Sequence, residues 1–261
     1  MLPVGLFASR AFTVANLATV AVYGGLSAAT FFIALFVQQV AGYGAFAAGL
    51  TLTPVWLFLI TLSRRFGALA DRLGPRGLMS LGPLLGAAGL LLVSRIGPDV
   101  RYASDLLPGV LLYGLGLSMT VAPLTATVLG AVEQRHAGVA SGVNNALARV
   151  AGLVAIAAVG AVVAFGFRAT LDARLAGERL SAGAGTTLAE LRARPLAVVD
   201  LRELPPGERA RVAPALEAAS VSGFRWGIVV SALLMASGGL VSFVGLRGPR
   251  GRQRTAPVRV A

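Results

Sequence analysis

The stretch Gly67-Ala68-Leu69-Ala70-Asp71-Arg72-Leu73-Gly74-Pro75-Arg76-Gly77 lies between two strongly apolar parts of the chain. Residues 11–63 before it and residues 77–94 after it contain no charged side chain. Glycine and proline beside charged residues are typical of a turn. We therefore expect a short charged turn joining two helices that only lipid or a protein core could accommodate.

The composition of the whole chain favours lipid. Of its 261 residues, 56% are hydrophobic and 13% are charged, with a mean hydropathy of +0.78. Soluble domains carry about 25% charged residues, so a soluble protein of this composition could not cover its surface. The sequence therefore predicts an all-α integral membrane protein that lies in a lipid bilayer.

Six stretches are long and apolar enough to cross a bilayer, which takes about 20 residues. Pro54 lies inside the second and Pro123 inside the fourth, and we expect these prolines to kink their helices. The fifth carries three polar residues in its first half, Asn144, Asn145 and Arg149. The six predicted spans are residues 11–37, 45–62, 77–94, 106–132, 138–167 and 226–246.

The segments outside the apolar stretches complete the expected organisation. Residues 1–10 form an N-terminal segment, residues 11–167 hold the first five spans, and residues 224–246 hold the sixth span, including the two residues before its apolar stretch. Residues 168–223 hold 7 of the 11 acidic residues, with leucines at helical spacing, and predict two or three short amphipathic helices. Residues 247–261 form a basic tail.

Charge patterning predicts the orientation, because short cytoplasmic loops carry an excess of arginine. All 23 basic residues are arginines. The short connections on the other side hold only Arg95 and Arg101, although the insert at residues 168–223 also carries arginines. We expect both termini in the cytoplasm and the insert outside. The arginines on the side of the termini are Arg10, Arg64, Arg65, Arg72, Arg76, Arg135 and five in the tail.

Composition also excludes several classes of protein. There is no cysteine and only one histidine, so disulfides, thiolate metal sites and cysteine nucleophiles are absent. No phosphate-binding loop, metal-ligand set or nucleophile–base pair is present, and no basic helix face suits nucleic acid. We expect neither an enzyme nor a bound cofactor or metal.

The pattern Gly67-x-Leu69-x-Asp71-Arg72-x-Gly74-x-Arg76 resembles the signature loop of the major facilitator superfamily, which joins the second and third helices of each six-helix half. Further segments look like the C-terminal half of fourteen-spanner drug:proton antiporters, the EmrB/QacA-like branch. These segments are Arg10-Ala11-Phe12-Thr13, Phe36-Val37-Gln38-Gln39-Val40-x-Gly42-Tyr43, Val121-Ala122-Pro123-Leu124-Thr125 and His136-Ala137-Gly138-Val139-Ala140-Ser141-Gly142-Val143-Asn144-Asn145.

The resemblance implies two three-helix repeats that form one half of such a transporter. It also implies efflux of hydrophobic or cationic compounds by alternating access and proton antiport. A full member has about twice this length, so a second half would be needed, from a second copy or a split partner. Its coupling carboxylates would lie in that other half, because the apolar cores here hold no acidic residue. Two alternatives remain: a membrane subunit that does not transport and binds a partner through its insert, and an inactive fragment.

Two groups of residues are candidates for function. The first is the conformational latch that the resemblance implies for Gly67, Asp71, Arg72, Gly74 and Arg76, in which Asp71 would pair with a helix end or a neighbouring arginine. The alternative for this group is a solvated turn. The second group could line the translocation path or its gate, and it consists of Asn144, Asn145, Arg149, Gln38 and Tyr23. Arg149 stands out because an intramembrane charge is costly; snorkelling to the interface is the alternative.

Overall fold

The computed structural model describes residues 4–178, 181–193, 195–196 and 201–246. The described residues are helices and short connections, with no strand among them. The expected basic tail at residues 247–261 lies outside the described residues.

Six helical segments are long and apolar enough to cross a membrane, as the sequence predicts. The second is interrupted, because helix α2 ends at Leu50 and α3 begins at Thr53. Pro54 therefore lies in the first turn of a new helix and does not kink a continuous one, since a proline there loses no intrahelical hydrogen bond. The six are α1 (Arg10–Gln39), α2 with α3 (Ala45–Leu50 and Thr53–Leu73), α4 (Pro75–Val93), α5 (Leu107–Gly130), α6 (Ala137–Leu175) and α8 (Pro206–Gly245).

Short elements complete the described chain: η1 (Val4–Ala8), η2 (Tyr102–Leu106), η3 (Gln134–His136), α7 (Ala182–Ala193) and η4 (Leu201–Glu203). Local signals set several helix ends. The Ser9 hydroxyl accepts a hydrogen bond from the Phe12 amide and caps α1. Pro206 is the first residue of α8, where proline is favoured. Pro123 lies inside α5, as predicted.

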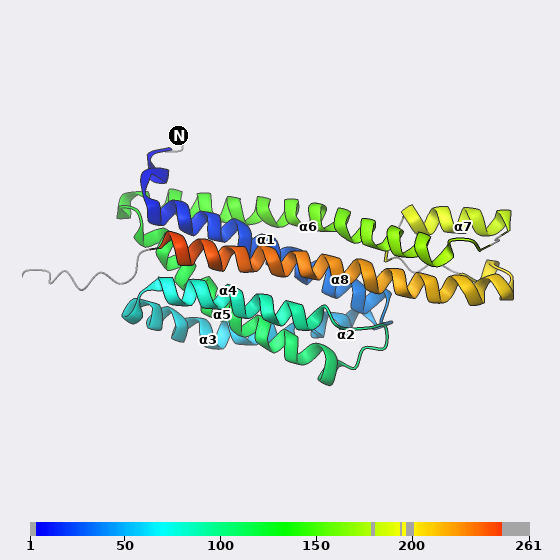
Figure 1. Cartoon of the computed structure of the whole chain (residues 1–261). Coiled ribbons are helices and arrows are strands. Elements are labelled where there is room, and N and C mark those ends of the chain that lie inside the picture. The colour runs from blue at the N-terminus through cyan, green and yellow to red at the C-terminus, as the bar shows by residue number, and fades with distance from the viewer. Residues whose placement is uncertain (1–3, 179–180, 194, 197–200, 247–261) are drawn as a thin grey trace, which may run out of the picture.

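The spanning helices run antiparallel to their neighbours along the chain (Figure 1). The α3–α4 turn, the α5–α6 connection and the end of α8 lie at the same end of the molecule as the N-terminus. The α1–α2 and α4–α5 connections lie at the opposite end, together with α7. We call these the signature end and the α7 end.

The packing pattern repeats after three spans. Helix α1 contacts α6 and α8, and α5 contacts α3 and α4. If the first, second and third spans trade places with the fourth, fifth and sixth, the contacts of α1 with α6 and α8 become the contacts of α5 with α3 and α4. The contact between α4 and α8 is unchanged by this exchange. This is the arrangement of two three-helix repeats that form half of a transporter.

Glycines allow the helices of the bundle to approach closely. A Cβ at Gly116 of α5 would lie 2.4 Å from the backbone nitrogen of Gly86 in α4 and 2.5 Å from the carbonyl oxygen of Gly82. The equivalent α1–α8 crossing is tight at Gly25, where a Cβ would lie 2.7 Å from the Ser231 carbonyl oxygen. Small residues at helix crossings are the rule in membranes, where van der Waals packing holds helices together.

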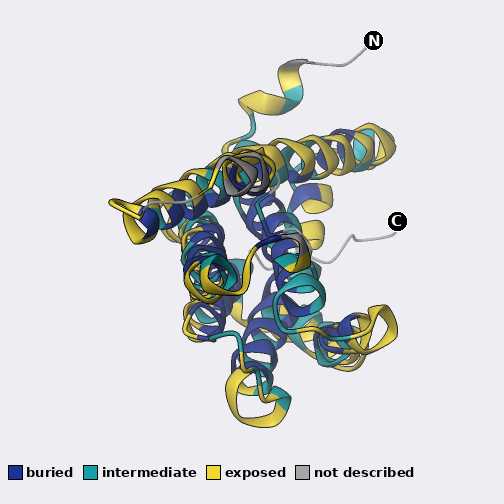
Figure 2. Cartoon of the chain, turned by 90° about the vertical axis from the view of Figure 1, so that its right-hand side faces the viewer, coloured by how far each residue is buried: buried dark blue, intermediate teal, exposed yellow. Residues whose placement is uncertain are grey.

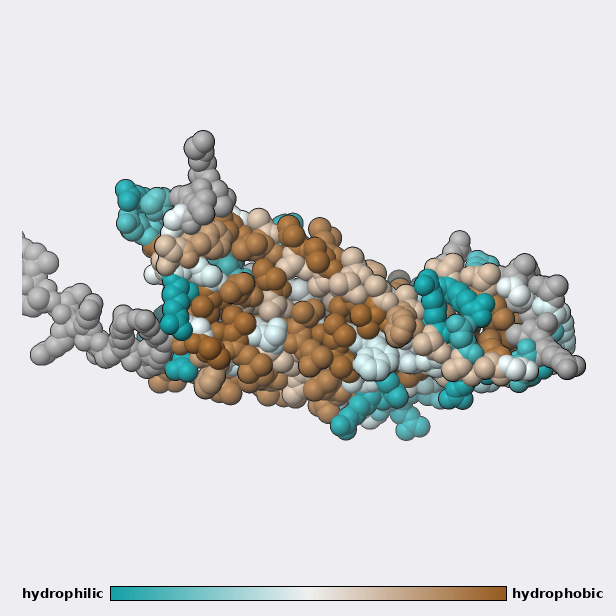
Figure 3. Space-filling view, turned by 45° about the horizontal axis from the view of Figure 1, so that its top comes forward, coloured by the Kyte–Doolittle hydropathy of each residue, from teal (hydrophilic) through white to brown (hydrophobic). Residues whose placement is uncertain are grey.

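The outer surface of the bundle is apolar. Buried residues lie along its interior and exposed ones around its outside in the end-on view (Figure 2). Hydrophobic side chains cover the middle of the molecule and hydrophilic ones gather at its two ends (Figure 3). Exposed apolar residues on different helices include Leu17, Ile60, Leu81, Leu153 and Leu233. Such a surface fits a bilayer.

Helices α6 and α8 extend well past the rest of the bundle (Figure 1). They have 39 and 40 residues, which corresponds to about 60 Å each, whereas a bilayer core is about 30 Å thick. The predicted boundaries at residues 167, 168 and 223 therefore fall inside continuous helices. The predicted amphipathic segment consists of the end of α6, then α7 and η4, and the first half of α8.

The extended parts of α6 and α8 enclose a separate hydrophobic core with α7 and η4, and we call this unit the protruding module. Ion pairs between described residues lie on it, including Arg192–Asp172 and Arg211–Glu178, both at 2.7 Å. The module thus resembles a small water-soluble helical domain. Its buried core consists of Phe167, Leu171, Leu175, Leu188, Leu191, Leu204, Val212, Ala215 and Ala219.

Candidate functional site

The signature segment is almost entirely helical. Helix α3 continues through Asp71 and Arg72 to Leu73, and α4 begins at Pro75. The expected turn over residues 67–77 is therefore reduced to Gly74 alone. Gly74 has a φ of +85°, which side chains other than that of glycine rarely adopt. Pro75 then starts α4, where its fixed φ is favourable.

Asp71 and Arg72 lie exposed on the last turn of α3. Within the described part of the chain, neither side chain has an ion pair or a hydrogen bond, so the expected pairing of Asp71 with a helix end or a neighbouring arginine is not formed there. Gly67 faces Ala122 of α5 at an ordinary contact distance of 3.7 Å for a Cβ placed on it. The Asp71 carboxylate and the Arg72 guanidinium are therefore exposed at the signature end.

Arg76, the last charged residue of the signature, binds the end of α8. Its Nε donates a hydrogen bond to the Phe243 carbonyl oxygen at 2.9 Å. Its guanidinium also lies over the Phe243 ring, 4.7 Å from the ring centroid, where a cation is attracted by the π-electrons. Arg76 thus ties the first turn of α4 to the last turns of α8.

Arg10, the first residue of α1, binds the same helix end. Its Nε donates to the Gly245 carbonyl oxygen at 2.9 Å and its Nη2 to the Val244 carbonyl oxygen at 3.3 Å. The last carbonyls of a helix lack intrahelical partners and carry partial negative charge. Arg10 and Arg76 together therefore form an arginine clamp that holds three consecutive carbonyls, on residues 243–245.

The clamp borders a cavity of about 360 Å³ between the ends of four helices, lined by Arg10, Ala11, Pro75, Thr127, Gly245 and Leu246. The sequence indicated Arg76 as part of the signature and Arg10 as part of a family-like segment, but it did not bring them together. Their common target, the end of α8, lies more than 160 residues from either.

Asn144 lies buried between α6 and α1. Its Nδ2 donates to Asn16 Oδ1 at 3.1 Å and to Thr19 Oγ1 at 2.7 Å. Both partners also bond to their own helix, Asn16 to the Phe12 carbonyl and Thr19 to the Ala15 carbonyl. This network joins two spanning helices, so the Asn144 amide is used within the bundle.

Asn145 and Arg149 lie on a different face of α6 from Asn144, and both side chains are exposed. No ion pair or hydrogen bond to another described residue engages the Arg149 guanidinium. Around it the same face is apolar and open, with Val150 59% exposed, Leu153 71% and Val154 61%. Arg149 is therefore an isolated charge on an apolar, uncovered helix face.

Tyr23 and Gln38 lie elsewhere on α1. Tyr23 is partly buried and packs against the two hydrophobic clusters of the bundle. Gln38 lies at the other end of α1, beside the α1–α2 connection, and is partly buried. The structure thus brings Asn144 into contact with α1 but does not gather Gln38, Tyr23 and Arg149 into one pocket.

Two helices are more open than the others. In the apolar stretches of the second span and of α6, 22% and 33% of residues are buried, against 50–56% in α1, α4 and α5. These two spans are the second and fifth, which exchange with each other between the two repeats. The exposed face of α3 includes Trp56, Leu57 and Ile60. Their openness is thus a feature of both repeats.

No group of three histidine, cysteine, aspartate or glutamate side chains that could hold a metal ion occurs among the described residues. The site consists of arginines, amides and open carbon surface, which suits binding and conformational change.

Comparison with known proteins gives consistent matches. The chain is 32% identical over 169 residues to the multidrug resistance protein Stp of Mycobacterium tuberculosis (strain ATCC 25618 / H37Rv), covering 64% of this chain and 30% of that protein. It is 30% identical over 169 residues to the puromycin resistance protein pur8 of Streptomyces alboniger, covering 62% and 33%. It is 30% identical over 185 residues to the probable actinorhodin transporter of Streptomyces coelicolor (strain ATCC BAA-471 / A3(2) / M145), covering 65% and 32%.

The aligned part of the chain corresponds to about a third of the length of these relatives. The family model described as Major Facilitator Superfamily matches residues 2–156, which include the signature segment and the first four spanning helices. With six spanning helices, two three-helix repeats and this match over more than half of its length, the chain belongs to the Major Facilitator Superfamily.

Proposed function

We propose that the chain is one half of an efflux transporter that moves hydrophobic or cationic small molecules out of the cell by alternating access, coupled to proton antiport. Family membership supports this, as do the names of its relatives, which include multidrug and puromycin resistance proteins. The observation that carries the proposal is the pair of open faces on α3 and α6, with Arg149, which has no ion pair to a described residue, on one of them.

A second half covers these faces in the working transporter. A charge at the centre of a bilayer costs roughly 2.5–3.5 kcal/mol or more, so lipid alone is a poor environment for Arg149. A second copy of the chain, or a separate N-terminal half, supplies an aqueous cavity or a polar partner there. In this family the substrate site forms between such units near the membrane centre.

Asn145 and Arg149 line the translocation path or its gate, on the face of α6 turned toward the second half. Asn144 holds α6 against α1 behind that face, and Tyr23 packs nearby in the same bundle. Gln38 borders the path near the α7 end. The coupling carboxylates belong to the second half.

The signature end works as a conformational latch with two parts. Gly74 and Arg76 fix the α3–α4 turn to α8 within this half, and Gly67 packs on α5. Asp71 and Arg72 are left open, and in this proposal they bind the second half in one of the two conformations of the transport cycle. Charge-assisted bonds of this kind are strong enough to favour one state.

The transporter lies in the cytoplasmic membrane with both termini inside and the protruding module outside. The short arginine-bearing connections at the signature end support this orientation. Because the chain has no cysteine, single substitutions can test it. An impermeant maleimide should label Ala189→Cys in intact cells and Gln134→Cys only after permeabilisation; the reverse pattern would invert the orientation.

Efflux itself is tested by dye accumulation in cells that lack their own multidrug pumps. The chain is expressed alone and together with the six-helix N-terminal half of a relative. We expect lower dye accumulation than in the empty-vector control in at least one case, and loss of this difference in Asp71→Asn and Arg149→Gln. Leu81→Ala, on the outside of the bundle, is the matched control. Unchanged accumulation with membrane-inserted protein in both cases would refute the transporter assignment.

Assembly is tested separately with single cysteines. Leu153→Cys on the open face of α6 should form a cross-link to a second copy or to the co-expressed half. Leu81→Cys, which is also exposed but lies on α4, should not. Equal cross-linking at both positions would contradict the proposed interface.

A further inference from the structure

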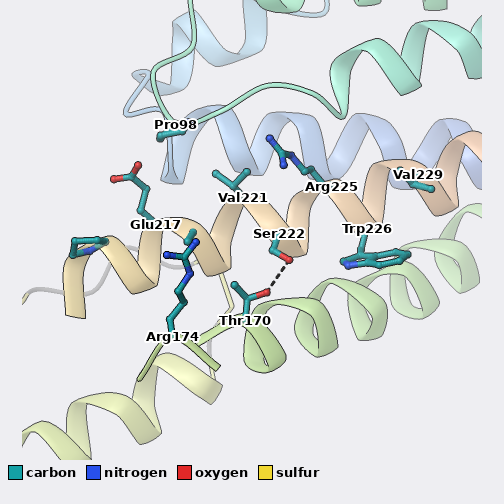
Figure 4. Close-up of a pocket in the computed structure, with 11 residues that line it drawn as sticks. Pro98, Thr170, Arg174, Glu217, Val221, Ser222, Arg225, Trp226 and Val229 are labelled. Atoms are coloured by element: carbon teal, nitrogen blue, oxygen red, sulfur yellow. Dashed lines mark hydrogen bonds between the residues drawn. The ribbon is translucent and has the colours of Figure 1, made fainter. Parts of the chain in front are cut away.

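A groove along α8 lies apart from the signature end and from the open faces of α3 and α6. It encloses about 870 Å³ between α8, the outer part of α6 and the α4–α5 connection at Pro98 (Figure 4). Its lining residues on α8 recur every three or four positions from Pro214 to Val229, so the groove follows one face of that helix. Its polar lining consists of Thr170, Arg174, Glu217, Ser222 and Arg225.

The groove holds charged side chains that have no partner among the described residues. No ion pair or hydrogen bond to a described residue engages the side chains of Arg174, Arg225 or Glu217. Nearby arginines do have partners, since Arg192 binds Asp172 and Arg211 binds Glu178. Arg174 extends from α6 toward α8, and Arg225 extends from α8 on the side of Pro98 (Figure 4). Two guanidinium groups against one carboxylate leave the groove net positive.

The floor of the groove is fixed. The Thr170 and Ser222 hydroxyls are hydrogen-bonded at 2.8 Å and join α6 to α8 along the groove (Figure 4). A Cβ at Gly166 of α6 would lie 2.9 Å from the Trp226 ring, so the indole lies directly over the α6 backbone. These contacts hold both walls of the groove in place before any ligand binds.

The position of the groove along α8 matches the boundary between the hydrocarbon core and the headgroups. Arg225 lies 20 residues from Gly245 at the signature end of α8, which is about 30 Å along the helix and about the thickness of the hydrocarbon core. Trp226 beside it is 56% exposed, and tryptophan is enriched at this level of a bilayer. The apolar end with Trp226 and Val229 therefore faces acyl chains, and Arg174 and Glu217 face headgroups.

We propose that this groove binds a phospholipid of the leaflet at the α7 end. Arg174 and Arg225 hold its phosphodiester, because guanidinium groups suit phosphate oxygens. Its acyl chain lies along Trp226 and Val229. Glu217 accepts a hydrogen bond from the hydroxyl of a glycerol headgroup or the ammonium of an ethanolamine headgroup. Phosphatidylcholine has no such donor and binds less well.

Native mass spectrometry of the purified chain in detergent tests the site. Phosphatidylglycerol, phosphatidylethanolamine and phosphatidylcholine are added singly, and soluble glycerol phosphate serves as the probe without acyl chains. We expect a bound-lipid peak with the first two lipids, and a weaker one with phosphatidylcholine. The double variant Arg174→Gln/Arg225→Gln should lower the ratio of bound to free protein by about tenfold or more, as expected for lost charge-assisted bonds.

The matched control is Arg95→Gln/Arg101→Gln, which removes the same charge at the same end but outside the groove. It should bind lipid as the unchanged protein does, and both double variants should keep the original melting temperature. Equal lipid binding by both double variants would overturn the proposal, and so would equal binding of glycerol phosphate and phosphatidylglycerol. The result is independent of efflux, because it requires neither substrate nor a second half.

Discussion

The membrane bundle and the protruding module share α6 and α8, but they are held together by different contacts. In the bundle, helices approach each other at glycines such as Gly25, Gly89 and Gly116. Serine and threonine hydroxyls bond to their own helix, as Ser118 does to the Gly114 carbonyl. In the module, leucines fill a core and ion pairs lie outside it.

The solvent explains this difference. Lipid is as apolar as a leucine side chain, so burying leucine between helices gains little there and shape fit decides. In water, each buried apolar side chain contributes about 1.5–3 kcal/mol. Helices α6 and α8 are therefore each stabilised by close packing in one part and by burial of apolar side chains in the other. Substitutions can show where along each helix the first kind of contact is replaced by the second.

The largest effect is expected at the α4–α5 crossing. Gly116→Leu would place a side chain where even a Cβ lies 2.4 Å from the Gly86 backbone nitrogen, and a backbone cannot move aside as a flexible side chain can. We expect the loss of monodisperse protein in size-exclusion chromatography. Gly130→Leu, in the same helix with nothing within 4 Å of a Cβ, is the control and should behave as the unchanged chain does. A normal elution profile for Gly116→Leu would show that the bundle does not depend on this approach.

The next effect compares the same change in the two regions. Leu191→Ala removes a fully buried leucine from the module, and we expect it to destabilise the module by about 2–5 kcal/mol. Leu81→Ala removes a leucine that is 60% exposed on the bundle, where lipid replaces the lost contacts. Limited proteolysis should detect faster cleavage near α7 in the first variant only. Similar cleavage of both variants would mean that the module is not a separate hydrophobic core.

Much of the bundle could be predicted from the sequence. The six spans follow from local runs of apolar residues. The ends of α6 and α8 could not be placed in this way, because hydropathy falls near residues 167 and 223 while the helical spacing of Leu171, Leu175, Val212 and Leu216 continues. Where a helix leaves the membrane its hydropathy falls although the helix continues, so hydropathy alone places the end of the helix too early.

The candidate site was less predictable, because its contacts join residues far apart in the chain. The signature residues were recognised by their spacing, but the partners of Arg10 and Arg76 on α8 lie 235 and 167 residues away. Asn144 stood out as a polar residue in an apolar run, while its bond to Asn16 spans 128 residues. Local patterns identify such groups, and only the packed helices show which of them face each other.

A smaller effect is expected from the buried amide of the bundle. Asn144→Ala removes the hydrogen bonds from α6 to Asn16 and Thr19. Such bonds contribute about 0.6 kcal/mol on average and at most about 1.7 kcal/mol in membranes, so the melting temperature in detergent should fall by a few degrees or less. Asn145→Ala, one residue away and exposed, should not change it. A large fall in both variants would point to a general intolerance of α6 to substitution.

The smallest effect is expected at the surface of the module, where the helices are joined by ion pairs and not by close packing at glycines. Arg192 and Asp172 are joined at 2.7 Å, but their side chains are 44% and 52% exposed, and exposed pairs contribute about 0–1 kcal/mol. Asp172→Asn should therefore speed amide exchange in α7 by no more than about fivefold. High salt should reduce this difference, because the Debye length falls to about 3 Å at 1 M salt. Arg192→Gln should give the same change, and the two substitutions together should add nothing further. An effect that is large or independent of salt would mean that this ion pair holds α7 in place and that the leucine core beneath it does not.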